Sequence, residues 1–228
     1  MNNFVPKLNL HNIYSEFETS ITAVDCGEMC RPHNPNGKPF CCDICQAVPA
    51  AYHQEWDFFS SQTDLWHIWR GNECAEKPEN PSLLLAETPE QLLLLACKGP
   101  GFCQREYRAL SCRQFPFFPY VTADYRFLGL AYEWHFEQTC WVINNLEKVK
   151  SKYQQEFIKL YDQIFALWQD EFDSYAIKSE EMRTHFIKLK RRIPILHRNG
   201  NFYLLSPGSE RIVRTQPEQF KTHGLYRR

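Results

Sequence analysis

Ten cysteines are the residues of this 228-residue chain best suited to do chemistry. All ten lie between positions 26 and 140, and several are separated by only a few residues, as are Cys26 and Cys30 or Cys42 and Cys45. Gaps of two to four residues between thiolates allow one loop to grip one metal ion. Because thiolate is a soft ligand, it selects zinc or iron–sulfur clusters over hard cations. The cysteine pattern therefore predicts a metal or cluster site.

Cys41 and Cys42 are direct neighbours. In an extended chain, adjacent side chains point to opposite sides, so such a pair rarely binds one ion together. A disulfide between neighbours is strained, because bridged Cα atoms ordinarily lie further apart than one peptide spacing. We expect the two thiols to serve separate sites or different irons.

Two further features could support bound thiolates. Cys97 and Cys103 bracket the segment "KGPGF", whose glycines allow a tight loop and leave backbone amides free to donate to sulfur. Arg113 follows Cys112, and its guanidinium could offset thiolate charge and donate hydrogen bonds. Arg113 is therefore expected at the cofactor-binding site, with an ordinary surface arginine as the alternative.

The segments "CGEMC", "CC" and "CKGPGFCQREYRALSCRQFPFFP" resemble the YkgJ-type cysteine-cluster family, a zinc- or iron-chelating domain shared with flagellin lysine N-methylases. Its most specific signature, Cys-Arg-x-Tyr/Phe-Pro-Phe, corresponds to residues 112–117. The resemblance spans about residues 24–142. It implies a set of eight metal ligands: Cys26, Cys30, Cys41, Cys42, Cys97, Cys103, Cys112 and Cys140.

The chain departs from the family pattern in two places. The insertion "RPHNPNGKPF" separates Cys30 from the Cys-Cys pair, and "QREYRALS" lacks the Arg-Pro that the family usually has there. Cys45 and Cys74 have no family counterpart, so we expect them to be small buried hydrophobic residues or free thiols.

Eight thiols fit two four-ligand zinc sites, or one four-iron cluster with thiols left over. The aromatic run "FPFFPY" could shield a cluster from water, or it could be an ordinary core strand. The leading hypothesis is a metal-binding protein with a structural or electron-transfer site. By resemblance, an alternative is a protein lysine N-methylase that uses S-adenosylmethionine and an iron–sulfur cluster. No Rossmann, Walker, GxSxG or HExxH motif is present.

Charge is unevenly distributed, although the formal total is −1. Residues 183–228 hold 11 Lys or Arg but only two Asp or Glu. This basic tail could balance the acidic remainder of the chain, which we favour, or bind a protein partner in a metal-stabilised interaction module. The second hypothesis assigns salt-sensitive binding to Lys188, Lys190, Arg191 and Arg192. Nucleic acid is not an expected partner, since no nucleic-acid motif accompanies the charge.

No apolar run approaches the roughly 20 residues of a membrane span. The N-terminal segment "MNNFVPKLNLHNIY" lacks the basic flank and apolar stretch of a secretory signal. We therefore expect a cytoplasmic protein with no membrane partner, in a compartment where structural disulfides are rare.

The expected fold is α+β: an irregular, metal-organised cysteine core over residues 1–140, and a packed extension of helices and short strands over 141–228. Periodic apolar residues predict one long helix over about 140–172, followed by a helix from Ser179 through Phe186. The runs "SLLLA" and "QLLLLAC" favour a hairpin that turns at "ETPE", with a helix starting at Thr88 as the alternative. "IPILH", "FYLLS" and "RIVRT" predict short strands joined by turns.

Overall fold

Helices and antiparallel sheets make up an α+β fold, as predicted, in a computed structural model that describes residues 9–74 and 81–227. The described chain divides into two units. Unit 1 contains residues 15–24 and 116–227, and unit 2 contains residues 9–14 and 25–115. The main change of unit thus falls after Phe115, whereas the sequence placed a boundary at residue 140. Residues 1–8, the start of the N-terminal segment that lacks the features of a secretory signal, lie outside the described residues.

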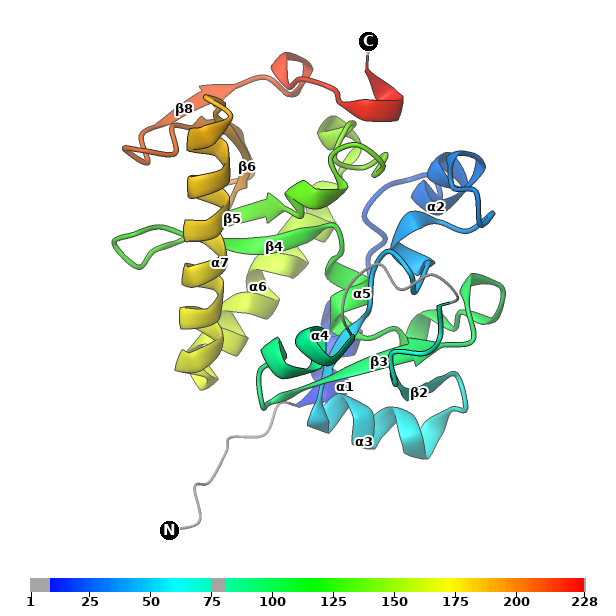
Figure 1. Cartoon of the computed structure of the whole chain (residues 1–228). Helices are drawn as coiled ribbons and strands as arrows, with labels where there is room; N and C mark the ends of the chain where they lie inside the picture. Colours follow the sequence, from blue (N-terminus) through cyan, green and yellow to red (C-terminus); the bar gives the residue numbers. More distant parts are fainter. Residues whose placement is uncertain (1–8, 75–80, 228) are drawn as a thin grey trace. The chain divides into compact units, whose positions relative to one another are not determined.

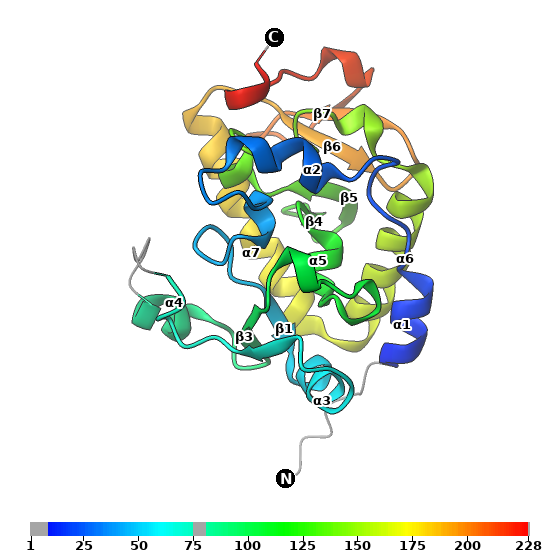
Figure 2. The same cartoon turned by 90° about the vertical axis from the view of Figure 1, so that its right-hand side faces the viewer.

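Unit 2 is built on a small antiparallel sheet with strand order β1-β3-β2. The register pairs Ala51 with Leu93 on one side of β3 and Trp66 with Cys97 on the other. Helix α3 contacts all three strands (Figure 2). The helices and strands of this unit are α1 (Leu10–Glu16, through Tyr14), α2 (Cys26–Cys30), β1 (Ala50–Tyr52), α3 (His53–Gln62), β2 (Trp66–Ile68), α4 (Pro81–Glu87), β3 (Leu92–Cys97) and α5 (Leu110–Gln114).

The predicted hairpin is half right. "QLLLLAC" contains strand β3, but "SLLLA" lies in helix α4. Pro81 opens this helix at a position where its missing N–H costs nothing, and the Thr88 hydroxyl donates to the carbonyl oxygen of Leu84 at 2.7 Å. A run of leucines without polar alternation is compatible with both a helix and a strand. The residues at its two ends, Pro81 and Thr88, therefore determine that this run is helical.

Unit 1 contains a five-stranded antiparallel sheet with strand order β4-β5-β6-β7-β8. Its last three strands coincide with the three predicted from "IPILH", "FYLLS" and "RIVRT", which confirms that prediction. The helices and strands of this unit are β4 (Phe117–Val121), β5 (Phe127–Tyr132), α6 (Ser151–Leu167), α7 (Gln169–Lys188), β6 (Ile193–His197), β7 (Phe202–Leu205) and β8 (Ile212–Thr215).

The long predicted helix over 140–172 is wrong at both ends. Residues before Ser151 form turns, yet Val142 and Leu146 are buried there and continue the apolar periodicity. Trp168 has an extended backbone, with φ −129° and ψ 99°, and therefore separates α6 from α7. Helix α7 begins at Gln169, ten residues before Ser179, where the second helix was predicted to start. No helix in the described residues is both long and apolar enough to cross a bilayer.

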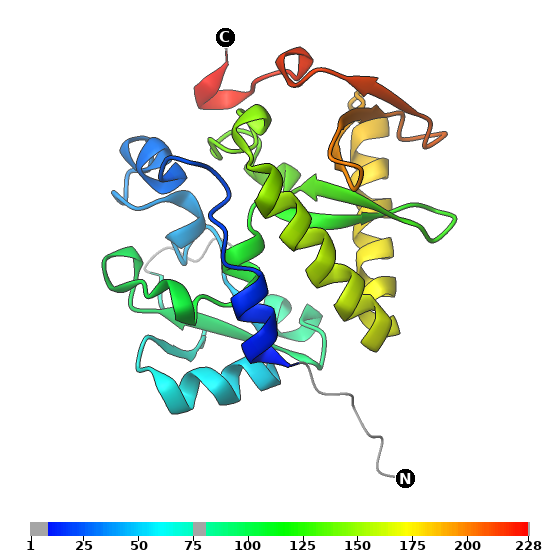
Figure 3. The same ribbon diagram turned by 180° about the vertical axis from the view of Figure 1, so that it is seen from behind.

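Helices α6 and α7 lie on opposite faces of β4 (Figures 1 and 3). The Phe117 ring contacts Tyr153 of α6, with centroids 6.0 Å apart, whereas the Lys178 ammonium of α7 lies 4.9 Å from the centroid of the Phe118 ring. Successive side chains of a strand point to opposite faces, so β4 is covered on both sides and fully buried. The aromatic run is therefore a core strand of unit 1.

Glu137 anchors a buried polar network in unit 1. Arg191 donates two hydrogen bonds to its carboxylate at 2.8 Å, and the Tyr132 hydroxyl also donates to it. Burial alone would raise the pKa of Glu137, but these hydrogen bonds outweigh burial and lower it. Arg191 thus has a structural role, in contrast to the partner-binding role considered for it.

We expect Arg191→Met to lower the free energy of unfolding by about 3–5 kcal/mol near pH 7, because it leaves a buried carboxylate uncompensated. Denaturant titration measures the loss. A carboxylate with a depressed folded pKa contributes stability above its unfolded pKa and loses it as pH falls through the folded pKa. The difference between wild type and variant should therefore shrink as the pH falls below 4.5, the ordinary pKa of the group.

Arg198→Met is the matched control. Arg198 pairs with Asp162 at 3.0 Å, but both side chains are more than 40% exposed. This variant should lose less than about 1 kcal/mol. Equal losses in the two variants would contradict the special role of the Glu137 network.

Candidate metal centre

Seven of the eight predicted ligands lie in unit 2, and none of the eight is in a disulfide. Cys140 belongs to unit 1. The seven lie in or next to short elements. Cys26 and Cys30 lie in α2, and Cys41 and Cys42 lie in the 3₁₀ turn Phe40–Cys42. Cys97 ends β3, Cys103 directly follows the 3₁₀ turn Pro100–Phe102, and Cys112 lies in α5.

Helix α2 places its two cysteines together. Cys26 and Cys30 are four residues apart, a spacing that puts both side chains on one helix face. Asp25 caps the helix by accepting a hydrogen bond from the Gly27 amide at 2.8 Å. Burial, with the charges of Asp25 and Cys30, raises the pKa of Cys26 to about 11.

The Cys41–Cys42 pair lies in a 3₁₀ turn. The extended backbone expected from the sequence is therefore not observed here. Their sulfur atoms are 4.0 Å apart. The Cys42 amide donates to the carbonyl oxygen of Pro39 at 2.9 Å, which closes the turn. Two neighbouring thiols can therefore face one site, and the geometric reason to separate them is absent.

The inserted segment before this pair is tied down by Asp43. The side-chain amides of Asn34 and Asn36 donate to one carboxylate oxygen of Asp43 at 3.1 and 2.7 Å, and the Cys45 amide donates to the other at 3.2 Å. Asp43 is only 1% exposed. The insertion that departs from the family pattern thus folds back to hold the turn bearing Cys41 and Cys42.

The Gly-rich loop after β3 behaves as predicted. The Gly99 amide donates to the Cys97 sulfur at 3.4 Å. Gly99 has φ +98°, a backbone conformation that other residues rarely adopt. The loop thus provides a backbone donor to a predicted ligand.

Arg108 is the guanidinium that faces the thiols. Its Nε donates to the Cys103 sulfur at 3.0 Å. Burial would lower the pKa of Arg108, but the hydrogen bond to Cys103 and the charges of Cys103, Cys42 and Cys112 raise it. Sequence reasoning missed this residue, since no motif marks it. The only signal was a cation between two predicted ligands.

Arg113, which is expected at the cofactor-binding site, binds several backbone carbonyl oxygens. Its guanidinium lies 4.3 Å from the centroid of the Tyr14 ring and donates to the carbonyl oxygens of Tyr14, Arg105, Glu106 and Arg108 at 3.0–3.1 Å. These bonds hold the loop that carries Arg108. Arg108, which this loop carries, donates to the sulfur of a predicted ligand, Cys103.

Buried Glu55 positions the helix that bears Cys112. Its carboxylate accepts hydrogen bonds from the Tyr14 hydroxyl at 2.6 Å and from the Leu110 amide at 2.8 Å. Leu110 is the first residue of α5. Burial raises the pKa of Glu55 despite these donors. Sequence reasoning missed Glu55, since no motif marks it.

Thiols from separate segments interact through their charges. Burial raises the pKa of Cys112, and the charges of Cys42, Cys97 and Cys103 raise it further. Burial likewise raises the pKa of Cys97, with contributions from Cys42 and Cys103, and of Cys30, with a contribution from Cys42. The short elements of unit 2 therefore bring Cys42, Cys97, Cys103 and Cys112 near enough for their charges to interact.

Cys42 is the exception among these thiols. A hydrogen bond with Cys41 lowers its pKa, burial opposes this, and the charges of Arg108 and Arg31 lower it further, to about 7. A thiol with this pKa is about half ionised at neutral pH. Among the described thiols of unit 2 whose pKa is shifted, Cys42 is the one shifted toward the thiolate, the form that binds metals.

Within the described residues, no three His, Cys, Asp or Glu side chains stand in a group that could hold a metal ion. The donor set of unit 2 nevertheless fits a soft metal by its chemistry, since it consists of thiols with amide and guanidinium donors to sulfur. Binding would therefore have to draw the thiols closer together.

Cys45 and Cys74 form a disulfide, with Cα atoms 5.7 Å apart. The prediction that they are free thiols or small buried hydrophobic residues is wrong. The two cysteines without a family counterpart are thus the two that pair with each other. The expectation that disulfides are rare in this chain did not anticipate the bond.

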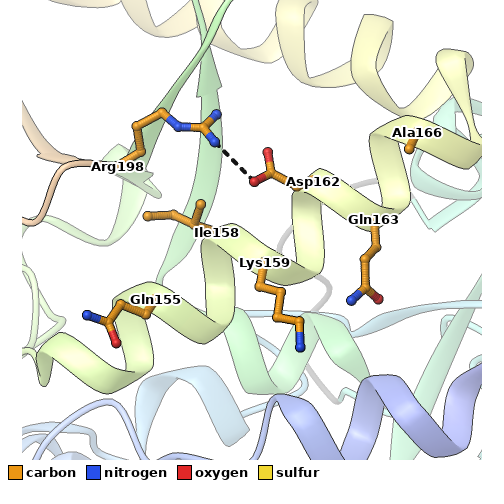
Figure 4. Close-up of a pocket in the computed structure, with 7 residues that line it drawn as sticks. All are labelled: Gln155, Ile158, Lys159, Asp162, Gln163, Ala166 and Arg198. Carbon is orange, nitrogen blue, oxygen red and sulfur yellow. Dashed lines mark hydrogen bonds and ion pairs between the residues drawn. The ribbon is translucent and has the colours of Figure 1, made fainter.

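A hollow of about 500 Å³ lies along the outer face of α6 (Figure 4). Arg198 and Asp162 form an ion pair beside it. It is lined by Gln155, Ile158, Lys159, Asp162, Gln163, Ala166 and Arg198. It contains no predicted site residue, and its open, mostly aliphatic and amide lining suggests no particular reaction.

No protein-family model, curated protein or solved structure matches this chain. The resemblance to the cysteine-cluster family therefore rests on the residues of the chain itself.

We expect alkylation of the denatured, unreduced protein to label eight cysteines and to leave Cys45 and Cys74 unlabelled. Reduction before alkylation should expose both together, because they share one bond. Peptide mass spectrometry makes the measurement. Labelling of Cys45 and Cys74 without reduction would contradict the disulfide.

Arg108→Gln should slow alkylation of Cys42 in the folded protein by about three- to tenfold near pH 7, because it removes a charge that favours the thiolate. The rate is measured site by site by mass spectrometry. Arg70→Gln, an exposed arginine of the same unit, is the control and should leave the rate unchanged. Equal rates in wild type and Arg108→Gln would show that this guanidinium does not act on the thiols.

Proposed function

We propose that unit 2 is a metal-binding domain of the cysteine-cluster type, which holds zinc or an iron–sulfur cluster through its thiolates. The ligand set comprises Cys26, Cys30, Cys41, Cys42, Cys97, Cys103 and Cys112. The observation that supports this most directly is that the Arg108 guanidinium donates to the Cys103 sulfur and the Gly99 amide to the Cys97 sulfur, two thiols whose charges also raise the pKa of Cys112.

Thiolate crowding is unfavourable without a cation. Several thiols of unit 2 share one neighbourhood, and each ionised sulfur raises the pKa of others. Packing alone does not require so many cysteines, since any small apolar residue would fill the same space. A bound cation converts this repulsion into attraction and contributes binding energy to the folding of loop-rich segments.

The residues around the thiols have distinct supporting roles. Arg108 offsets negative charge and donates to Cys103, and the Gly99 amide donates to Cys97. Asp43 fixes the turn of Cys41 and Cys42, and Glu55 fixes α5. A bound metal would supply folding energy as a structural site, or an electron as a redox site.

Purification without oxygen, followed by metal analysis and a visible spectrum, tests the proposal. Brown protein with iron and sulfide indicates a cluster, and colourless protein with stoichiometric zinc indicates a structural site. Folded protein that holds no metal, either as purified or after reconstitution with zinc or with iron and sulfide, would overturn the proposal.

Ligand variants sharpen this test. Cys42→Ser and Cys112→Ser should each reduce bound metal to less than about half of the wild-type content, because thiolates are individually strong ligands. The double variant Cys45→Ser/Cys74→Ser is the matched control, and it should keep its metal. Cys140→Ser asks whether the thiol of unit 1 takes part, as the family resemblance implies. Equal losses in the control and the ligand variants would contradict the assignment.

A further inference from the structure

Two turns of unit 1 meet at one edge of its five-stranded sheet. The register pairs Ile193, the first residue of β6, with Leu205 at the end of β7, and pairs Leu205 in turn with Ile212 at the start of β8. Arg192 and Arg211 immediately precede Ile193 and Ile212. The end of α7 and the β7–β8 turn therefore place their side chains at the same edge.

The cations at this edge form no ion pair with a described carboxylate. Three others of the basic tail do, since Arg183, Arg191 and Arg198 pair with Glu210, Glu137 and Asp162. By contrast, four exposed cations form no ion pair with a described residue: Lys188, Lys190, Arg192 and Arg211.

Glu210 does not neutralise these four cations. It is the carboxylate of the β7–β8 turn, but Arg183 holds it at 2.9 Å, and it also accepts hydrogen bonds from the Tyr120 hydroxyl and the Ala123 amide. The edge therefore presents a cluster of positive charge to solvent.

Lys190 occupies a backbone position that ordinarily favours glycine. Its φ is +52°, and it follows the last turn of α7, where its amide donates to Ile187 and the Arg191 amide donates to Phe186, both at 3.0 Å. This is the arrangement in which helices commonly end with a left-handed glycine. A lysine there is strained, and such strain is characteristic of positions with a functional use.

Two aliphatic side chains alternate with the lysines. Ile187 is 52% exposed and Leu189 is 45% exposed, so the edge offers apolar contacts as well as charge. A surface of this composition complements an acidic segment that also carries aliphatic side chains. It has no aromatic side chain on which nucleic-acid bases could stack.

We propose that this cationic edge, made of residues 187–190 with Arg192 and Arg211, docks an acidic, aliphatic-bearing segment of a partner protein. The proposal is independent of the metal-binding function, because every residue involved lies in unit 1. It excludes Arg191, whose guanidinium is committed to Glu137.

Binding of a fluorescein-labelled peptide of Glu and Leu residues to the full chain tests the proposal by fluorescence anisotropy. The peptide should bind more tightly than polyglutamate, oligothymidine or phosphatidylserine vesicles, and added salt should weaken its binding. The triple variant Lys188→Gln/Lys190→Gln/Arg192→Gln should weaken it by about tenfold. The control Arg126→Gln/Lys148→Gln/Lys152→Gln removes the same charge from elsewhere in unit 1 and should leave binding unchanged.

Lys190→Gly separates a binding role from a structural one. Glycine relieves the backbone strain, so this variant should have a higher melting temperature than wild type and yet bind the peptide more weakly. Absence of peptide binding, tighter binding of the oligonucleotide or vesicles, or equal weakening in the control triple would each overturn the proposal. A Lys190→Gly protein that binds as tightly as wild type would also overturn it.

Discussion

The cost of ionising several buried thiols in one neighbourhood is the constraint on which the proposed metal centre of unit 2 depends. Cys42 has a pKa of about 7 and is readily ionised, whereas burial and neighbouring charge raise the pKa of Cys112. Ionising the remaining thiols would add charge of the same sign to one neighbourhood. The guanidinium of Arg108, together with that of Arg31 at Cys42, offsets part of this charge. A soft cation would offset the rest, and this is the physical basis for assigning metal binding to the unit.

Holding such a set together requires rigid loops, and the buried polar residues provide them. Asp43 gathers the amides of the inserted segment, Glu55 holds the start of α5, and Arg113 binds carbonyl oxygens around the loop of Arg108. Each satisfies backbone or side-chain groups that would otherwise be costly to bury. Unit 1 has a different basis, with an aromatic strand covered on both faces and ion pairs of its own.

Local chemistry made part of this structure predictable. Turn residues between short β-rich runs located the last three strands, and glycine freedom located the amide that donates to Cys97. The ends of α6 were not predictable, because no local signal marks them. Val142 and Leu146 extend the apolar period of α6, although they are buried from turns, and Trp168 breaks the helix without proline or glycine.

The same limit applied to the site. The sequence identified which cysteines resemble a ligand set, but it did not show that Cys45 lies within bonding distance of Cys74, 29 positions away. It also favoured Arg113 because that residue adjoins a cysteine in a recognisable motif. The contact of Arg108 with Cys103 depends on how the loop 105–108 folds, and Arg113 holds that loop through hydrogen bonds to carbonyl oxygens, which every residue type possesses.

The most direct test of the account is to count, by peptide mass spectrometry, the thiols of reduced, metal-free protein that added zinc protects from alkylation. A shared site predicts that Cys42, Cys97, Cys103 and Cys112 become protected together at one zinc concentration, because thiols from separate segments then bind as a unit. Protection of no thiol, or of Cys26 and Cys30 alone, would contradict a centre assembled from distant parts of the chain.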